Sequence, residues 1–374
     1  MTTYTSQRLP AEWEPQSFVQ LTWPHEETDW APYLKEAQQC FLAIAKEIVK
    51  HEDLLIVAPD TAEVKEQLLQ AGILNSQTKY TIGETGALIC STETYDIVLY
   101  ECPTNDTWAR DHAFITTVDS EGEPTLNDFC FNGWGQKFAS NKDNMINECL
   151  YIDKIIRCRK NNNLPIYADN RKKVLEGGSI ESDGAGTLLT TSSCLFAPNR
   201  NWFEDKKEAE VTLQDLGGKH SLWLDHGYLC GDDTDGHIDT LARLCPNDTI
   251  VYAKSSDEND IDYEELQAME KELLAFRSAE GKTYRLVPLP MPEPIYEEDG
   301  YRLPATYANF LIINGAVLMP TYRQPSTDKI ALKTLQELFP DREVIGIDCY
   351  VLIRQHGSLH CVTMQFPESV ILAK

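Results

Sequence analysis

The sequence predicts an α/β fold, because helical and strand patterns alternate along the chain and polar clusters recur at a regular spacing. The chain has 374 residues, of which 42% are hydrophobic and 25% are charged. This length suits either one large closed domain or two domains, and both could bury a substantial core. No segment is biased enough in composition to indicate disorder. We therefore expect a single domain over residues 1–374.

The first half of the alternation contains two clear helices. Residues 32–49 carry apolar side chains at helical spacing behind Asp29. A second helix is expected from Thr61 to about Ala71, where Gly72 would end it. The runs expected to form strands lie at 53–60, 97–103, 113–118, 187–191, 249–253, 309–315, 316–320 and 361–366.

Later helices are expected after Asp262 and after Ser326. Asp262 is followed three residues later by Glu265, which is the spacing of a capping box. The segment 287–300 is rich in proline and acidic residues. Such a segment could join two domains, but it also suits a long surface loop, and we expect a loop that covers the site.

Four clusters of residues that could take part in catalysis recur at a regular spacing in the sequence. They contain Asp111, Glu176, His237 and Cys361, which are 65, 61 and 124 residues apart. A pitch of about 60 residues indicates repeated supersecondary units. An N-terminal unit around SFVQLTWP and an uncharged one around TYANFLIINGAVLMP bring the count to about five. Five units that each deliver one polar loop to a shared centre would form a radial, propeller-like fold. The alternative is chance spacing among four points.

The net charge of −26 limits the classes of partner. It would repel nucleic acid and anionic membrane surfaces and would attract a small cationic substrate, although solubility alone can explain an acidic surface. The N-terminal segment 1–17 lacks the apolar core of a signal peptide. The longest apolar run, at 309–319, is far shorter than the roughly 20 residues that span a bilayer. We expect a soluble, cytoplasmic protein.

The sequence gives no sign of a metal or cofactor. The eleven cysteines are scattered and never form CxxC, which favours reduced thiols over disulfides or a zinc ribbon. His356 and His360 have the spacing of helical metal ligands, but Gly357 lies between them and no partner ligands are evident. DDTDGH lacks the terminal carboxylates of a calcium loop. GxSxG, GxxxxGK[ST] and HExxH are absent.

The remaining candidates are one thiol beside a histidine, a second histidine flanked by acids, and two further acids. Guanidine hydrolysis requires groups of these kinds. Carboxylates match the donor fork of a guanidinium, and a thiolate is a strong nucleophile for its central carbon. A histidine can protonate the departing ammonia and then activate water, and a carboxylate beside it would orient it.

Seven motifs in order resemble those of the agmatine deiminase family, also called the bacterial Porphyromonas-type peptidylarginine deiminase family, within the guanidino-group-modifying superfamily. They are LTWPHEETDW, WARD, LEGGSIESDGAGTLLTT, PNRN, GDDTDGHIDTLAR, YANFLIINGAVLMPTY and GSLHCVTMQF. The resemblance covers nearly the whole chain. It implies a fivefold pseudosymmetric α/β propeller (pentein) with no cofactor. It also implies hydrolysis of agmatine to N-carbamoylputrescine and ammonia through a covalent thiouronium on cysteine.

The resemblance assigns the groups that would carry out the chemistry. Cys361 is similar to the family nucleophile, His237 to its general acid and base, and Glu176 to the carboxylate that works with the histidine. Taken singly, Glu176 could cap a turn before two glycines, and Cys361 could be an ordinary core residue.

The resemblance also implies how the substrate is held. Asp111 and Asp239 match the pair that clamps the guanidinium, and Trp108 falls where the family packs an aromatic ring against it. Trp23 is expected to help close the pocket. Taken singly, Asp111 could instead be a structural ion-pair partner of an arginine.

Agmatine is expected to be preferred over free arginine, because recognition of a substrate carboxylate calls for a cation in the pocket. Arg110, Arg200 and Arg243 are the candidates near the motifs, against a large excess of acids. Peptidylarginine remains an alternative substrate if the mouth is wide enough. An amidinotransferase and a noncatalytic polyamine-binding module are the rival functions, and a homo-oligomer is a possible assembly.

Overall fold

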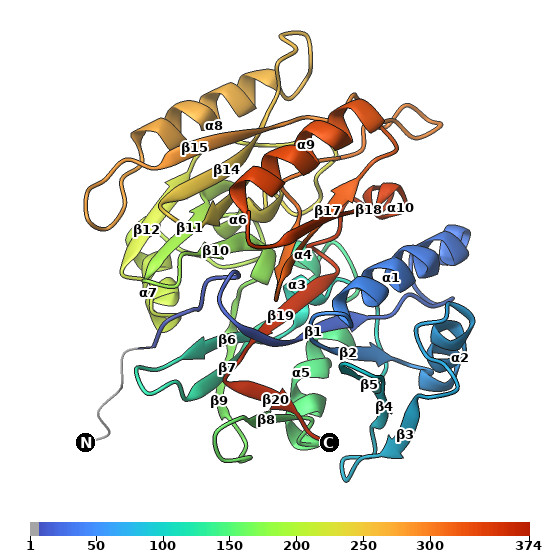
Figure 1. The fold of residues 1–374 in the computed structure, drawn as a ribbon. Helices are drawn as coiled ribbons and strands as arrows, with labels where there is room; N and C mark the ends of the chain where they lie inside the picture. The colour runs from blue at the N-terminus through green and yellow to red at the C-terminus, as the bar shows by residue number, and fades with distance from the viewer. Residues whose placement is uncertain (1–6) are drawn as a thin grey trace, which may run out of the picture.

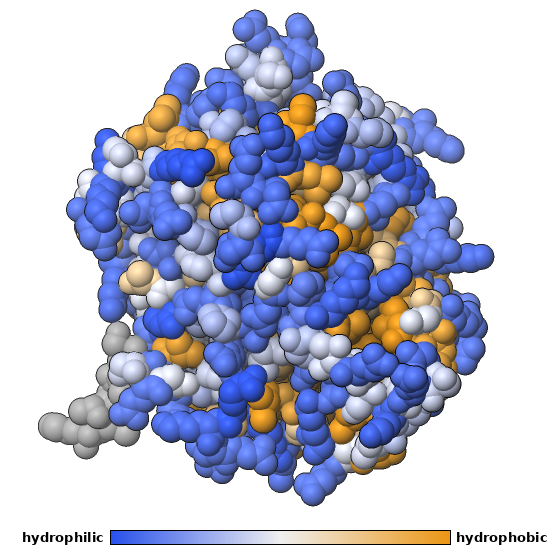
Figure 2. All heavy atoms as spheres, in the orientation of Figure 1, coloured by the Kyte–Doolittle hydropathy of each residue, from blue (hydrophilic) through white to orange (hydrophobic). Residues whose placement is uncertain are grey.

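The computed structural model describes residues 7–374, so the beginning of the segment 1–17 lies outside the described residues. Strands and helices alternate along this part of the chain, which confirms the predicted α/β class (Figure 1). Figure 2 shows a face on which hydrophilic side chains predominate, as expected for a protein with a net charge of −26.

Four three-stranded sheets share one strand order, in which an antiparallel pair is followed by a parallel strand. These sheets are β6 (Ile115–Val118), β7 (Pro124–Cys130) and β9 (Ile166–Val174); β10 (Ile180–Ser182), β11 (Thr187–Thr191) and β12 (His220–Leu224); β13 (Ala242–Cys245), β14 (Thr249–Lys254) and β15 (Arg285–Pro290); and β16 (Leu311–Ile313), β17 (Ala316–Thr321) and β18 (Glu343–Asp348).

The fifth unit brings the two ends of the chain together. β19 (Thr363–Pro367) pairs antiparallel with β1 (Gln16–Thr22), which pairs parallel with β2 (Asp53–Ala58). This sheet continues through β5 (Asp96–Glu101), β4 (Leu88–Ser91) and β3 (Lys79–Ile82). A separate two-stranded sheet pairs β20 (Val370–Leu372) with β8 (Ile156–Cys158).

In each of the five units a helix connects the two parallel strands, because such strands need a crossover connection. These helices are α1 (Leu34–Ile48), α5 (Asp143–Ile152), α7 (Lys206–Asp215), α8 (Tyr263–Ala275) and α9 (Pro325–Leu338), and α2 (Thr61–Gln70) lies between β2 and β3. The remaining helices are short: η1 (Ala31–Tyr33), α3 (Ala109–His112), α4 (Gly133–Gln136), η2 (Gly177–Ser179), α6 (Ser192–Leu195), η3 (Ile238–Thr240) and α10 (Tyr350–Ile353).

The core forms where the crossover helices pack on the sheets. On α1, the side chains of Ala37, Phe41, Ile44 and Ile48 are fully buried, as the helical spacing in the sequence predicts. Residues 54–58 of β2 are also buried, because this strand lies inside its sheet and is covered.

Three details of the expected elements were wrong. The helix at 34–48 has Tyr33, not Asp29, at its N-cap position, with η1 preceding it. Helix α8 begins directly after Asp262, as expected, but the Asp262 side chain forms no capping hydrogen bond; its carboxylate instead accepts from the Cys230 backbone N–H at 2.7 Å. The segment 287–300 is not all loop, because residues 287–290 belong to β15. That strand lies at the edge of its sheet, where proline is tolerated.

Within residues 7–374, none of the helices has the length and apolar character required to span a bilayer.

We predict that Asp60→Ala lowers the free energy of unfolding by about 1 kcal/mol. The Asp60 carboxylate accepts hydrogen bonds from the backbone N–H groups of Ala62 and Glu63 at the start of α2, and alanine would leave both donors without this acceptor. Urea unfolding measures the difference, with Glu66→Ala on the same helix as the matched control. Equal midpoints for both variants would contradict the capping role.

Candidate active site

Short segments directly before the first strands of four units bring the predicted residues together. Asp111 lies in α3 before β6, and Glu176 precedes η2 and β10. His237 and Asp239 lie at η3 before β13, and Cys361 precedes β19. All five side chains are at most 4% exposed. The spacing of about 60 residues therefore reflects the repeat of the fold, since each of these units delivers polar groups from the same position.

Asn309 supplies the fifth such position and was missed. It precedes β16, and its Oδ1 accepts hydrogen bonds from the backbone N–H groups of His360, at 2.9 Å, and Cys361, at 3.3 Å. The Cys361 Sγ lies 3.4 Å from the same oxygen. The sequence analysis did identify a fifth unit around this residue. Asn309 was not recognised as a site residue because its side chain is an uncharged amide.

The thiol of Cys361 lies beside acidic groups. Its Sγ is 3.8 Å from Asp239 Oδ2. Burial, together with the negative charges of Asp239 and Asp111, raises the pKa of Cys361 well above its ordinary value. The residue is therefore a neutral thiol in this arrangement, and a cation placed beside it would favour the thiolate.

His237 lies between two carboxylates. Its Nδ1 is 3.7 Å from Asp111 Oδ1 and its Nε2 is 3.7 Å from Glu176 Oε2. Burial alone would lower the pKa of His237, but the charge of Asp111 and the contacts with Cys194 and Glu176 raise it well above its ordinary value. Neither ring nitrogen has a hydrogen-bond partner among residues 7–374, so a protonated His237 could still donate to a substrate.

Glu176 is held by a buried arginine. The Arg200 Nε lies 2.9 and 3.0 Å from the two carboxylate oxygens of Glu176. Burial would raise the pKa of Glu176, but the nearby His237 and the charge of Arg200 hold it below its ordinary value. Glu176 is therefore ionised and can stabilise a cationic His237.

Asp111 is oriented by two hydrogen bonds. The indole Nε1 of Trp134 donates to its Oδ2, and the Gly178 backbone N–H donates to its Oδ1, each at 3.0 Å. Burial raises the pKa of Asp111 to about 6. A Cβ at Gly178 would lie 2.6 Å from His237 Nδ1 and 2.9 Å from Asp111 Oδ1, so glycine is required here because the space is already occupied.

A pocket of about 430 Å³ leads to this group and reaches both Asp111 and Cys361. Four aspartates and two tryptophans line it, and its described lining contains neither lysine nor arginine. The lining residues are Asp29, Asp106, Trp108, Asp111, Trp134, Phe138, Asp233, Thr234, Gln355, His356, Gly357 and Cys361. This acidic, aromatic lining suits a cationic ligand.

Trp108 is fixed in the pocket wall. Its indole Nε1 donates to Asp106 Oδ2 at 2.9 Å, and a Cβ at Gly357 would lie only 2.2 Å from its ring. Its ring meets that of Trp134 edge to face at 6.2 Å. Glycine at 357 therefore makes room for the tryptophan.

The expectation that Trp23 helps to close the pocket was wrong. Trp23 does not line the pocket; it is buried, donates from Nε1 to Gln67 Oε1 at 2.9 Å and packs edge to face on Phe41. It directly follows β1, and these two contacts are with residues of α1 and α2.

Trp134 is the second tryptophan that lines the pocket, and it has a positive φ of 53°. The flanking glycines in NGWGQ indicated a turn without indicating a pocket residue.

The segment 287–300 does not line the pocket either. Its Glu297 instead forms an ion pair at 2.7 Å with Arg354, which directly precedes the lining residues 355–357. Just beyond the segment, the ring of Tyr301 meets that of His356 edge to face at 5.5 Å. This segment therefore contacts a wall of the pocket and does not cover its mouth.

The three arginines near the motifs lie close to buried glutamates and are not available to a substrate in the pocket. Arg200 binds Glu176, and Arg243 binds both Glu12 and Glu181. Arg110 is buried with its Nη2 3.9 Å from Glu12 Oε2. None of them lines the pocket.

Among residues 7–374, two clusters have ligand atoms close enough to hold a metal ion. One consists of Glu176, Cys194 and His237, and the other of Glu12, Glu181 and His360. Arg200 binds the glutamate of the first cluster, and Arg243 binds both glutamates of the second. These arginines already neutralise carboxylates that a metal would require.

Comparison with known proteins gives consistent relatives over nearly the full length. The model of the Porphyromonas-type peptidyl-arginine deiminase family matches residues 8–367. A putative agmatine deiminase of Marinomonas sp. (strain MWYL1) is 32% identical, and the match covers 98% of this chain and 97% of that protein. An agmatine deiminase of Pseudomonas aeruginosa (strain LESB58) is 31% identical, with 96% and 95% covered.

Two solved structures are similar in both sequence and fold. The putative arginine deiminase of Porphyromonas gingivalis is 47% identical with a TM-score of 0.84, and the match covers 98% of this chain and 99% of that one. A cysteine-to-serine variant of the C. jejuni agmatine deiminase, solved with substrate bound, is 34% identical with a TM-score of 0.83, with 99% and 98% covered. The chain therefore belongs to the Porphyromonas-type peptidyl-arginine deiminase family, and agmatine deiminases are among its full-length relatives.

Proposed function

We propose that this protein hydrolyses agmatine to N-carbamoylputrescine and ammonia, with Cys361 as the nucleophile. The observation that carries the proposal is the Cys361 thiol in the lining of an acidic, tryptophan-lined pocket, 3.8 Å from Asp239 and in the same buried group as a cationic His237. A binding module would not need the thiol and histidine, and full-length relatives bear the name agmatine deiminase.

Asp111 and Asp239 would bind the guanidinium from two sides. Carboxylates accept paired hydrogen bonds from its planar donor fork. Asp239 Oδ1 is buried without a hydrogen-bond partner among residues 7–374, so it can accept from a substrate. Trp108 and Trp134 form the wall beside this position, where an aromatic face favours a cation.

The bound substrate would then activate the thiol. Its positive charge offsets the acidic groups that keep Cys361 protonated, so the thiol can release its proton to solvent and become a thiolate once the guanidinium lies beside it. The thiolate attacks the central carbon and forms a carbon–sulfur bond. Protonated His237 donates to the departing nitrogen, the carbon–nitrogen bond breaks, and ammonia leaves a thiouronium on Cys361.

Hydrolysis of the thiouronium would use the same histidine as a base. His237 has lost its proton to ammonia and can accept one from water, while Glu176 stabilises the imidazolium that forms. Water attacks the same carbon, the carbon–sulfur bond breaks, the remaining hydroxyl proton restores the Cys361 thiol, and N-carbamoylputrescine leaves. These steps need no metal, and the arginine-bound carboxylates of the site support a reaction without one.

We also propose that residues 1–374 form one catalytic domain, a fivefold pseudosymmetric α/β propeller. The common strand order of five units, with a site residue before the first strand of each, supports this arrangement. A cytoplasmic location stays a prediction, as does a homo-oligomer.

Cys361→Ser should lose nearly all ammonia release from agmatine while it still binds agmatine, because serine lacks an accessible anionic nucleophile and leaves the carboxylates in place. Ammonia assays and calorimetry measure the two properties. With the wild-type enzyme, intact-protein mass spectrometry of a quenched reaction should find an adduct on Cys361. A fully active serine variant would refute the assignment of the nucleophile.

The kcat/KM for agmatine should decrease as the pH falls below about 6. Burial raises the pKa of Asp111 to about 6, so the carboxylate becomes protonated through this range and no longer pairs with the guanidinium. Asp106, whose pKa burial raises to about 7, provides the control. Asp106→Asn should retain a decrease near pH 6, and a wild-type profile that is flat from pH 5 to 8 would contradict the role of Asp111.

Agmatine should have a kcat/KM about a hundredfold or more above that of free arginine. The described lining of the pocket offers aspartates to an ammonium group and neither lysine nor arginine to a carboxylate, and an unpaired, desolvated carboxylate costs at least about 3 kcal/mol. A blocked arginine peptide lacks that carboxylate and is the alternative substrate. Equal or higher efficiency on arginine or on the peptide would refute agmatine and leave the deiminase chemistry intact.

A further inference from the structure

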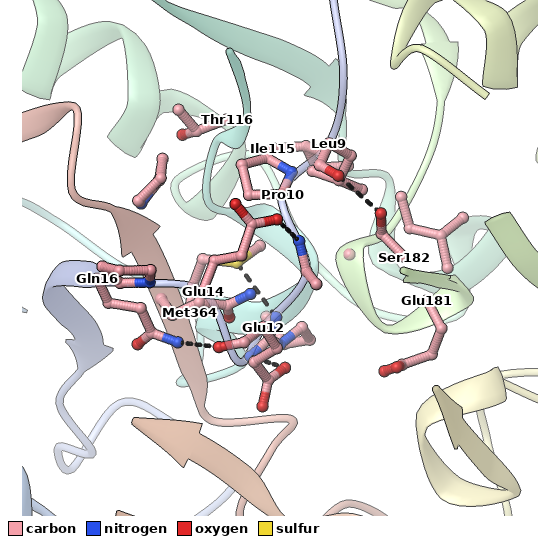
Figure 3. Close-up of a pocket in the computed structure, with 17 residues that line it drawn as sticks. Leu9, Pro10, Glu12, Glu14, Gln16, Ile115, Thr116, Glu181, Ser182 and Met364 are labelled. Carbon is pink, nitrogen blue, oxygen red and sulfur yellow. Dashed lines mark hydrogen bonds and ion pairs between the residues drawn. The ribbon is translucent and has the colours of Figure 1, made fainter. Parts of the chain in front are cut away.

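His360 is buried between two carboxylates, and the steps above do not use it. Its Nδ1 lies 2.7 Å from Asp239 Oδ2, and its Nε2 lies 2.8 Å from Glu12 Oε2. Glu12 comes from the N-terminal segment, 348 residues away in sequence, and lines a second pocket that shares no lining residue with the first (Figure 3). His360 thus connects the Asp239 side of the active site with the border of another pocket.

The hydrogen bonds indicate the charge on the ring. Ionised carboxylates only accept hydrogen bonds, so contacts from both ring nitrogens require a proton on each nitrogen. Arg243 Nη2 lies 3.0 Å from His360 Nε2, and both atoms lie 2.8 Å from Glu12 Oε2. Two donors that share one acceptor oxygen account for the short distance between the two nitrogens.

The surrounding charges support the same assignment. Three buried carboxylates, those of Glu12, Glu181 and Asp239, surround the two buried guanidinium groups of Arg110 and Arg243. A buried charge without a partner is costly, and a cationic His360 provides the third positive charge. Burial would raise the pKa of Asp239, but the hydrogen bond and charge of His360 hold it below its ordinary value.

We propose that His360 is a positioning residue, an imidazolium that joins Glu12 to Asp239 and orients the Asp239 carboxylate toward the substrate. This rests on the proposed function, which assigns Asp239 to guanidinium binding. His360 contacts Oδ2 of Asp239, and Oδ1 has no hydrogen-bond partner among residues 7–374, so it is available to the substrate. Glu12 is fixed in turn, because its Oε1 accepts from the Ile312 backbone N–H at 2.6 Å.

Two amide variants separate the two hydrogen bonds of the ring. The amide nitrogen of His360→Asn can take the place of Nδ1 and still donate to Asp239, whereas that of His360→Gln takes the place of Nε2 and reaches only toward Glu12. Agmatine affinity is measured by calorimetry with each variant in the inactive Cys361→Ser background. We expect His360→Gln to weaken binding about tenfold or more and His360→Asn to restore most of the loss.

Glu12→Gln provides a second route if His360→Gln fails to fold, which thermal unfolding will show. The amide should weaken agmatine binding by about threefold or more, because it removes one of the two charges that hold the imidazolium. Glu14→Gln is the matched control in the same segment. Glu14 binds Arg8 at 2.6 Å and does not contact His360, so agmatine binding should be unchanged.

Unchanged binding in folded His360→Gln, or equal loss in the Asn and Gln variants, would overturn the positioning role. If His360→Gln fails to fold, unchanged agmatine binding in Glu12→Gln would also overturn the positioning role. A role in packing alone would lower the unfolding temperature without separating Asn from Gln in agmatine affinity. Failure of the proposed function is a different result, because the wild-type enzyme would then release no ammonia from agmatine.

Discussion

The site depends on the burial of carboxylates beside a neutral thiol. Asp111 and Asp239 lose their hydration and stand close to Cys361, whose pKa they help to raise. Such a group of acids can be buried only where cations offset its charge. Arg200 neutralises Glu176, Arg243 neutralises Glu12 and Glu181, and His237 lies between Asp111 and Glu176. A guanidinium substrate would add the cation that the clamp and the thiol still require.

The repeated unit explains how this concentration of charge can be assembled. Each of the five units has an antiparallel strand pair, a crossover helix and a parallel strand, and a site residue lies directly before the first strand of the pair. Rigid sheets therefore hold groups that are far apart in sequence. Pairing of β19 with β1 brings Cys361 toward the N-terminal segment that contains Glu12. The pocket walls come from the longer connections, where Trp134 and Phe138 lie.

The sequence was sufficient for the α/β class and for the group of five residues that converge. The spacing predicted repeated units, and the motif resemblance identified Asp111, Glu176, His237, Asp239 and Cys361. Other parts depended on contacts that no local pattern shows. Glu12 reaches His360 only because the two ends of the chain pair, and the placement of Trp134 depends on a positive φ between glycines. Trp23 was misplaced because its position after β1 did not indicate that it would pack on Phe41.

The most direct test of the account is the crystal structure of Cys361→Ser with agmatine bound. We predict that the guanidinium lies between Asp111 and Asp239, with its central carbon facing the side chain of residue 361 and its plane beside Trp108. The amine end should point away from Cys361 toward the acidic residues of the pocket. A guanidinium bound in the outer pocket, without contact to Asp111 and Asp239, would contradict the account.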